Sequence, residues 1–328
     1  MITKVLSEKI KIASFICTVM VVFRHSRNLQ AFDISADSYC AFIETVFSKI
    51  TEIAVPYFFL VSGFFFFSQS YCKFCAYKTM FSKKLRTLFI PFLFWNIVGF
   101  IIFAFAGQIG FNDYWYVYII NILTSTWNGP LWYVRDLMTM IFFIPVYGWI
   151  MNWGKWWLFT IVFIVLFHLW IPVACNWVSY ESILFFFGGG ILWRYPIVIN
   201  YKTNRWVLGI LFVIWMMRCI IFPNSWFLNK YNIILGIIVF WQLLNYLPKK
   251  IHNKCLKIAP FSFFIYVAHI FVVKIAKAGA NHFFHANDFV ALITYFACPI
   301  ITIALLFHLG KKWKKHFLSS YNLVTGNR

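Results

Sequence analysis

The stretch IKIASFICTVMVVFRH, residues 10–25, indicates what kind of protein this chain is. It is apolar along most of its length, lysines flank its start, and it ends on a histidine. This pattern is typical of a helix that crosses a membrane from the basic, cytoplasmic side. Arg24 and His25 would then lie at or just inside the far face. Ionisable groups at that depth are costly and are candidates for function, although both side chains could instead reach the interface.

The composition excludes a soluble globular protein. Hydrophobic residues make up 62% of the 328 residues and charged residues 12%, whereas about a quarter of a typical soluble domain is charged. The net charge of +20 does not indicate nucleic-acid binding, because the basic residues lie between apolar runs. The first run lacks a small-residue cleavage site, so we expect it to be retained as a span. The chain is predicted to be an integral protein of the lipid bilayer.

Ten apolar segments approach the roughly 20 residues that a spanning helix needs. They lie at residues 10–25, 50–68, 87–107, 130–150, 156–174, 180–194, 206–222, 230–247, 259–277 and 288–309. The alternation typical of a transmembrane barrel is missing from the sequence. We therefore expect an all-α polytopic bundle of about ten transmembrane helices, in one domain over residues 1–328. The longest interruptions, 26–49 and 108–129, are expected on the surface.

The distribution of basic residues orients this predicted bundle. With the N-terminus in the cytoplasm, most lysines and arginines fall in inner loops, and acidic residues such as Asp33, Asp113 and Asp288 fall outside. Both termini are then cytoplasmic. The glycines at 188–190 are expected to allow close helix approach or a break in the sixth span.

Five ionisable side chains are predicted to share a layer in the outer half of the membrane. In chain order they are His25, Glu52, Arg135, Asp136 and Glu181. Such a cluster is stable only if its members pair or face a wet cavity. Structural alternatives stay open, because Arg135 and Asp136 can form an architectural ion pair. Glu52 and Glu181 can be interfacial, and His269 in the ninth span can be a packing residue.

One cysteine pair has a spacing found in metal sites. Cys72 and Cys75 form a C-x-x-C on a basic loop. A zinc site needs a second pair of ligands, and the sequence has none nearby. We expect ordinary reduced thiols and no metal.

Six stretches together resemble a known family. They are VVFRH at 21–25, VPYFFLVSGFFFF at 55–67, KKLRTLFIPFLFW at 83–95, GPLWYVRDLM at 129–138, FFFGGGIL at 185–192 and SFFIYVAH at 262–269. In this order and spacing the chain resembles the acyltransferase-3 family of bacterial membrane acyltransferases. The resemblance implies a ten-span enzyme of the bacterial cytoplasmic (inner) membrane. Members move an acyl group, usually acetyl, from cytoplasmic acyl-CoA to a hydroxyl of a glycan such as O-antigen, capsule or exopolysaccharide.

The resemblance implies that His25 is the essential catalytic residue. The family often has an Arg or Lys eleven residues earlier, where this chain has Ser14. Lys11 lies one turn before Ser14. At 100° per residue, Ser14 is about 20° and Lys11 about 40° from His25 around the helix, on opposite sides. Lys11 is therefore a candidate for the missing cation. Arg86 corresponds to the family's basic residue before the third span.

Acyl transfer to a hydroxyl needs a base and a group that stabilises the oxyanion. We expect His25 to be the base, Glu52 or Asp136 to orient it, and Arg135 to stabilise the negative charge or position the acceptor. An acyl-histidine is the less favoured route. The side chains expected at the acceptor are Arg24, Ser62, Trp132, Glu181, Tyr266 and His269. Those expected at the phosphates of acyl-CoA are Lys11, Ser14, Lys83, Lys84 and Arg86.

Positive-inside topology alone would explain why Lys83 and Lys84 lie where they do, without a role in binding acyl-CoA.

Two other functional classes fit parts of the pattern. A transporter of lipid-linked sugars or other amphiphiles would also have ten spans and a buried polar cluster, but many transporters show internal repeats and no duplication is evident here. A membrane sensor or scaffold would not need a histidine and an arginine in the same layer. The expected partners are acyl-CoA, a glycan or lipid-linked glycan, and the bilayer.

Overall fold

The computed structural model describes residues 3–27, 34–35, 37–68, 74–110, 113–124, 127–145, 156–168, 178–196, 199, 201–223, 225–284 and 287–327. All regular secondary structure within these ranges is helical, as expected. The chain divides into two compact units, which are described separately. Unit 1 comprises Met1–Tyr57 and Tyr201–Lys312, and unit 2 comprises Phe58–Asn200 and Trp313–Arg328.

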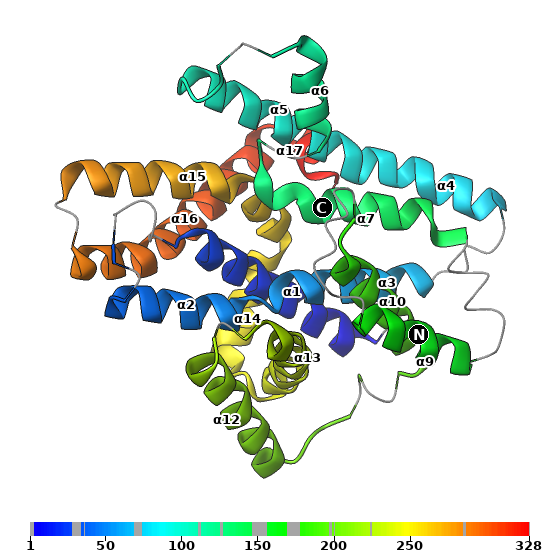
Figure 1. Cartoon of the computed structure of the whole chain (residues 1–328). Coiled ribbons are helices and arrows are strands. Elements are labelled where there is room, and N and C mark those ends of the chain that lie inside the picture. Colours follow the sequence, from blue (N-terminus) through cyan, green and yellow to red (C-terminus); the bar gives the residue numbers. More distant parts are fainter. Residues whose placement is uncertain are drawn as a thin grey trace. The chain divides into compact units, whose positions relative to one another are not determined.

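Unit 1 is built around its first helix. Its elements are α1 (Lys4–His25), α2 (Tyr39–Thr51), the start of α3 (Ala54–Phe67), α12 (Arg205–Ile221), α13 (Trp226–Leu243), η3 (Leu244–Tyr246), α14 (Lys249–Ile258), η4 (Ala259–Phe261), α15 (Ser262–Phe283) and most of α16 (Asp288–His316). Helix α1 packs against α2, α14 and α15 (Figure 1). Ala13, Cys17 and Val21, four residues apart, are buried on one face of α1. This spacing places them on one stripe of the helix.

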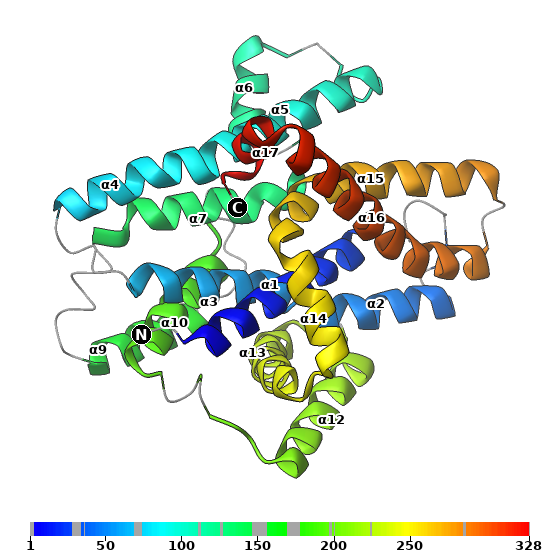
Figure 2. The ribbon, with the colours of Figure 1, turned by 180° about the vertical axis from the view of Figure 1, so that it is seen from behind.

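Unit 2 contains the middle of the chain and its C-terminal helix. Its elements are the rest of α3, α4 (Phe74–Lys84), η1 (Leu85–Phe89), α5 (Ile90–Phe105), α6 (Trp115–Leu123), η2 (Gly129–Leu131), α7 (Trp132–Phe142), α9 (Trp156–His168), α10 (Tyr180–Arg194) and α17 (Leu318–Thr325). Helix α17 packs on α5 (Figure 2). The indole N–H of Trp95 donates to the carbonyl of Val324 at 2.9 Å. This buried hydrogen bond ties the C-terminal helix to unit 2.

A proline explains the π-helical turn η1 of unit 2. Pro91 has no N–H, so the carbonyl of Thr87, four residues earlier, lacks its α-helical donor. The chain widens over Leu85–Phe89, where the N–H of Ile90 bonds to Leu85 O, five residues back. This turn carries Arg86.

Small residues let α3 and α10 touch backbone to backbone, as the glycines at 188–190 predict. A Cβ built on Gly189 would lie 2.6 Å from the backbone nitrogen of Phe64 and 3.0 Å from the carbonyl carbon of Gly63. Helix α10 continues through all three glycines without a break.

Four helical stretches of the described residues are long and apolar enough to cross a membrane. They are Tyr39–Phe67, Tyr77–Phe105, Lys249–Phe283 and Asp288–His316. The expectation that 26–49 lies on the surface is wrong for its second half. Helix α2 leads into α3, and Cys40 and Glu44, one turn apart, are fully buried. The ten-span topology and the cytoplasmic termini stay predictions.

Candidate active site

His25 is the last residue of α1, and the side chain of the next residue helps to end the helix there. The hydroxyl of Ser26, which is fully buried, donates to the carbonyl of Val22 at 2.9 Å. The N–H of Ser26 bonds to the carbonyl of Phe23. These bonds satisfy two carbonyls of the last turn, which otherwise lack intrahelical donors.

The ring of His25 lies beside the ring of His269 on α15. Their centroids are 5.2 Å apart and their planes are inclined at 49°. His269 is fully buried, and its Nδ1 is 2.6 Å from the carbonyl oxygen of Tyr266. Its Nε2 is buried without a hydrogen-bond partner among the described residues. The ring of Tyr266 is 6.1 Å from that of His269. Unit 1 thus unites three residues that sequence analysis singled out.

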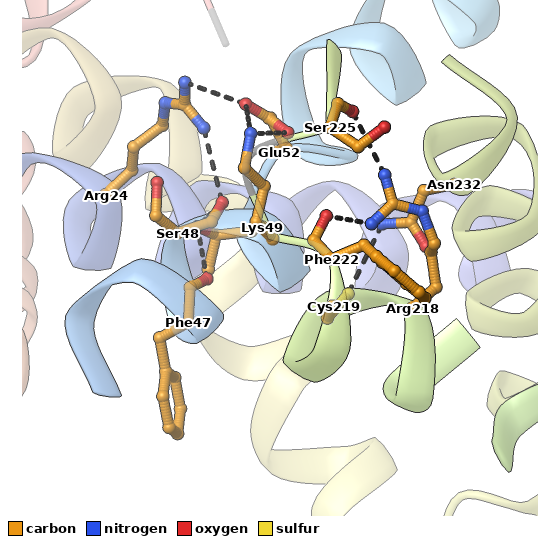
Figure 3. A network of polar contacts seen from close by, with 11 residues as sticks. Arg24, Phe47, Ser48, Lys49, Glu52, Arg218, Cys219, Phe222, Ser225 and Asn232 are labelled. Carbon is orange, nitrogen blue, oxygen red and sulfur yellow. Dashed lines mark hydrogen bonds and ion pairs between the residues drawn. The ribbon is translucent and has the colours of Figure 1, made fainter. Parts of the chain in front are cut away.

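Glu52 pairs with two cations (Figure 3). Its Oε1 lies 3.4 Å from Arg24 Nη2, and both of its oxygens lie 3.4 Å from Lys49 Nζ. Arg24 Nη1 also donates to the carbonyl of Ser48 at 3.3 Å. No hydrogen bond joins Glu52 to His25 among the described residues. The orienting role expected for Glu52 therefore stays a prediction, while its contacts are with Arg24 and Lys49.

The charged side chains that interact electrostatically with His25 are cations. They are Arg24, Lys274 and Lys277. Lys277, on α15, donates from Nζ to the carbonyl of Arg27. Lys274 and Lys277 are not among the site residues predicted from the sequence. The signal was available, because both are ionisable groups in or near the predicted span 259–277.

In unit 2, Asp136 is fully buried and is the centre of a polar cluster. Its Oδ1 accepts from Arg135 Nε at 3.2 Å and Nη2 at 3.0 Å. Its Oδ2 accepts from the N–H of Ser179 at 3.0 Å and the hydroxyl of Ser182 at 2.7 Å. Arg135 Nη1 donates to the carbonyl of Thr124 at 3.1 Å. These bonds satisfy the carboxylate and join α7 to the start of α10, which favours the architectural alternative for this pair.

The remaining acceptor candidates of unit 2 lie on α3, α7 and α10. The hydroxyl of Ser62 is 2.9 Å from that of Tyr133. The ring of Trp132 lies 6.1 Å from that of Phe59. Glu181 is half-buried in the first turn of α10, where the helix dipole favours a negative charge.

The basic residues expected at the donor differ in exposure. Lys83 and Arg86 are exposed, whereas Lys84 is half-buried with its Nζ 4.8 Å from the ring centre of Phe66. In unit 1, Lys11 is exposed and Ser14 is half-buried. Lys11 and Ser14 therefore differ in exposure as well as in chemistry.

Lys9 is a half-buried cation that the sequence shows only as part of the basic flank. Its Nζ donates to Asn245 Oδ1 at 2.7 Å and lies 4.0 Å above the ring centre of Trp241. Burial, and then the charge of Lys202, lowers the pKa of Lys9 to about 8. No local pattern distinguishes it from the other lysines, because its partners come from α13 and η3.

Comparison with known families shows to which family the chain belongs. The family model of the acyltransferase-3 domain, described as an acyltransferase domain, matches residues 10–309. The chain belongs to the acyltransferase-3 family. The match includes His25 and every other candidate site residue. No curated protein and no solved structure matches the chain.

Membership of the acyltransferase-3 family supports a membrane acyltransferase. The candidate site residues fall into both units, with His25, Glu52, Tyr266 and His269 in unit 1 and Arg135, Asp136 and Glu181 in unit 2. The predicted common layer stays a prediction. The described residues contain no group of three His, Cys, Asp or Glu side chains placed to hold a metal. Cys72 lies outside the described residues.

Proposed function

We propose that this membrane acyltransferase transfers an acetyl group from cytoplasmic acetyl-CoA to a hydroxyl of an envelope or exported glycan. The observation that carries the proposal is the position of His25. This residue ends the first helix of a chain that matches the acyltransferase-3 domain from residue 10. Half-buried His25 lies beside the fully buried ring of His269, and no acid is hydrogen-bonded to it among the described residues.

His25 is the general base in this proposal. A neutral imidazole removes the proton from the acceptor hydroxyl, and the oxygen then attacks the thioester carbonyl. The surrounding cations support this role in two ways. They oppose a positive charge on the resting ring, and they favour the negative charge that develops on the carbonyl oxygen. Arg24 and Lys277 are the side chains in unit 1 that we assign to this stabilisation.

The donor enters from the cytoplasmic side in this proposal. We assign the phosphates of acetyl-CoA to basic side chains at the inner face, with Arg86 and Lys83 favoured because both are exposed. Cationic side chains bind phosphates through charge-assisted hydrogen bonds. The proposal includes ten spans, both termini in the cytoplasm and location in the bacterial inner membrane.

The test is acetyl transfer in membranes that carry either the native chain or His25→Ala at equal protein level. Labelled acetyl-CoA is the donor, and a mixed envelope-glycan extract is the acceptor. We expect label on glycan with the native chain and none above background with His25→Ala. A general base contributes about 100-fold to 10,000-fold to the rate. Label that persists unchanged in His25→Ala would refute the catalytic assignment, and no label with the native chain would refute the acceptor or donor.

A further inference from the structure

We propose that His269 is a positioning residue for His25, whose ring it orients by accepting a hydrogen bond at Nε2. The proposal rests on the proposed function of His25 as the base. It goes beyond that function because it assigns the orienting partner, which is a neutral histidine on α15 instead of an acid.

The hydrogen bond at Nδ1 defines the tautomer of His269. A backbone carbonyl can only accept, so the nitrogen that lies 2.6 Å from Tyr266 O carries the hydrogen. A positive charge on this fully buried ring, beside the cations that surround His25, would be costly. The ring is therefore neutral, and its Nε2 carries a lone pair that can accept a hydrogen bond.

The separation of the two rings is short enough for Nε2 to meet a nitrogen of His25. Nε2 is buried and has no partner among the described residues, and a buried acceptor without a donor is destabilising. Two imidazole rings joined by a hydrogen bond of about 3 Å have centres about 5 Å apart. The observed separation of 5.2 Å matches this value. The described residues show no hydrogen bond between the two rings, so the proposal requires the His25 ring to turn about its side-chain bonds until an N–H is directed at Nε2.

The local charges explain why the partner is a histidine. Arg24, Lys274 and Lys277 act on His25, and Glu52 is held by Arg24 and Lys49. An acid beside His25 would pair with these cations as readily as with the imidazole. A neutral acceptor has no such competition, so it orients the ring without forming ion pairs.

The proton balance follows from this arrangement. His25 donates one N–H to His269 Nε2, and its other nitrogen takes the proton from the acceptor hydroxyl. The oxygen forms a bond to the thioester carbonyl carbon, the carbon–sulfur bond breaks, and the CoA thiolate leaves. The imidazolium of His25 then returns its proton to the thiolate. His269 stays neutral throughout, and its lone pair stabilises the transient imidazolium.

Two variants separate positioning from packing. His269→Asn keeps an N–H near the position of Nδ1 but has no acceptor at the position of Nε2. His269→Gln places an amide oxygen near that position. We expect kcat for acetyl transfer to fall about 100-fold in His269→Asn with the KM for acetyl-CoA unchanged, and His269→Gln to recover most of this loss. A role in packing alone would lower both variants together, through protein level and thermal stability.

A second measurement does not depend on transfer activity. Diethyl pyrocarbonate modifies the unprotonated nitrogen of imidazole, and mass spectrometry gives the rate at His25, with exposed His308 as internal reference. If His269 holds the N–H of His25, the other nitrogen is available, and the rate at His25 falls several-fold in His269→Asn but not in His269→Gln. Equal rates at His25 in the native chain and both variants would overturn the proposal. A native chain that transfers nothing would refute the proposed function, while the modification rates still decide the contact.

Discussion

Replacing Gly189 by alanine tests whether the α3–α10 crossing holds unit 2 together. The added methyl would lie 2.6 Å from the backbone nitrogen of Phe64 and 3.0 Å from the carbonyl carbon of Gly63. These are backbone atoms of a helix, so no side-chain rotation relieves the overlap. The two helices must move apart by roughly 1 Å, and overpacking of this kind costs about 1–3 kcal/mol. Alanine returns up to about 1 kcal/mol through its higher helix propensity.

The neighbouring glycine supplies a matched control. A Cβ on Gly188 would meet only the ring of Phe163, at 3.4 Å, which is a tolerable contact. Gly188→Ala keeps the propensity gain without the clash, so we expect it to be neutral or slightly stabilising. Gly189→Ala is expected to lose about 1–2 kcal/mol net.

The assay is thermal unfolding of the detergent-solubilised protein, followed by tryptophan fluorescence. Trp193 on α10 is a suitable reporter because its ring lies 5.5 Å from that of Phe64 on α3. A loss of 1 kcal/mol corresponds to a fall in Tm of about 2–4 °C for a unit of this size. Equal Tm values for Gly189→Ala and Gly188→Ala would show that the two helices do not meet backbone to backbone, and the reasoning would fail.

Three further predictions concern buried polar contacts. Asp136→Asn leaves the Arg135 charge unpaired, and we expect it to destabilise unit 2 by about 3–5 kcal/mol, measured as lost protein level and lower Tm. Lys9 has a folded-state pKa of about 8, below its ordinary value of 10.5; the unfolded chain therefore holds this proton to higher pH, and stability rises between about pH 8 and 10.5. Trp95→Phe removes the bond to Val324 O and should cost about 1 kcal/mol, with faster proteolysis at the C-terminus.

Each of these predictions has its own control. Ser62→Ala lies in the same unit as Asp136 and removes a half-buried hydroxyl, so its effect on Tm should be much smaller. Lys9→Gln should abolish the rise in stability with pH, whereas exposed Lys11→Gln should leave it in place. Phe94→Leu is next to Trp95 and keeps the indole bond, so C-terminal proteolysis that is equally fast in this variant would contradict the role of the bond.

The sequence alone determined the helical class, the membrane character and the identity of the main catalytic candidate. Long apolar segments can satisfy their backbone only as helices in lipid, and a histidine at the end of the first segment is unusual enough to be singled out. The glycines at 188–190 also predicted a close approach, because nothing but a missing side chain lets two helix backbones touch.

The tertiary structure decided which polar groups meet. Helices that are apolar on all sides carry no stripe that shows which face turns inward. For that reason the sequence could not pair His25 with His269, or show that Glu52 is held by Arg24 and Lys49. It could not foresee that Asp136 is satisfied by Arg135 and the start of α10, since hydrogen bonds between distant segments depend on how helix faces come together. Ionisable residues could be named from their cost at membrane depth, but their partners could not.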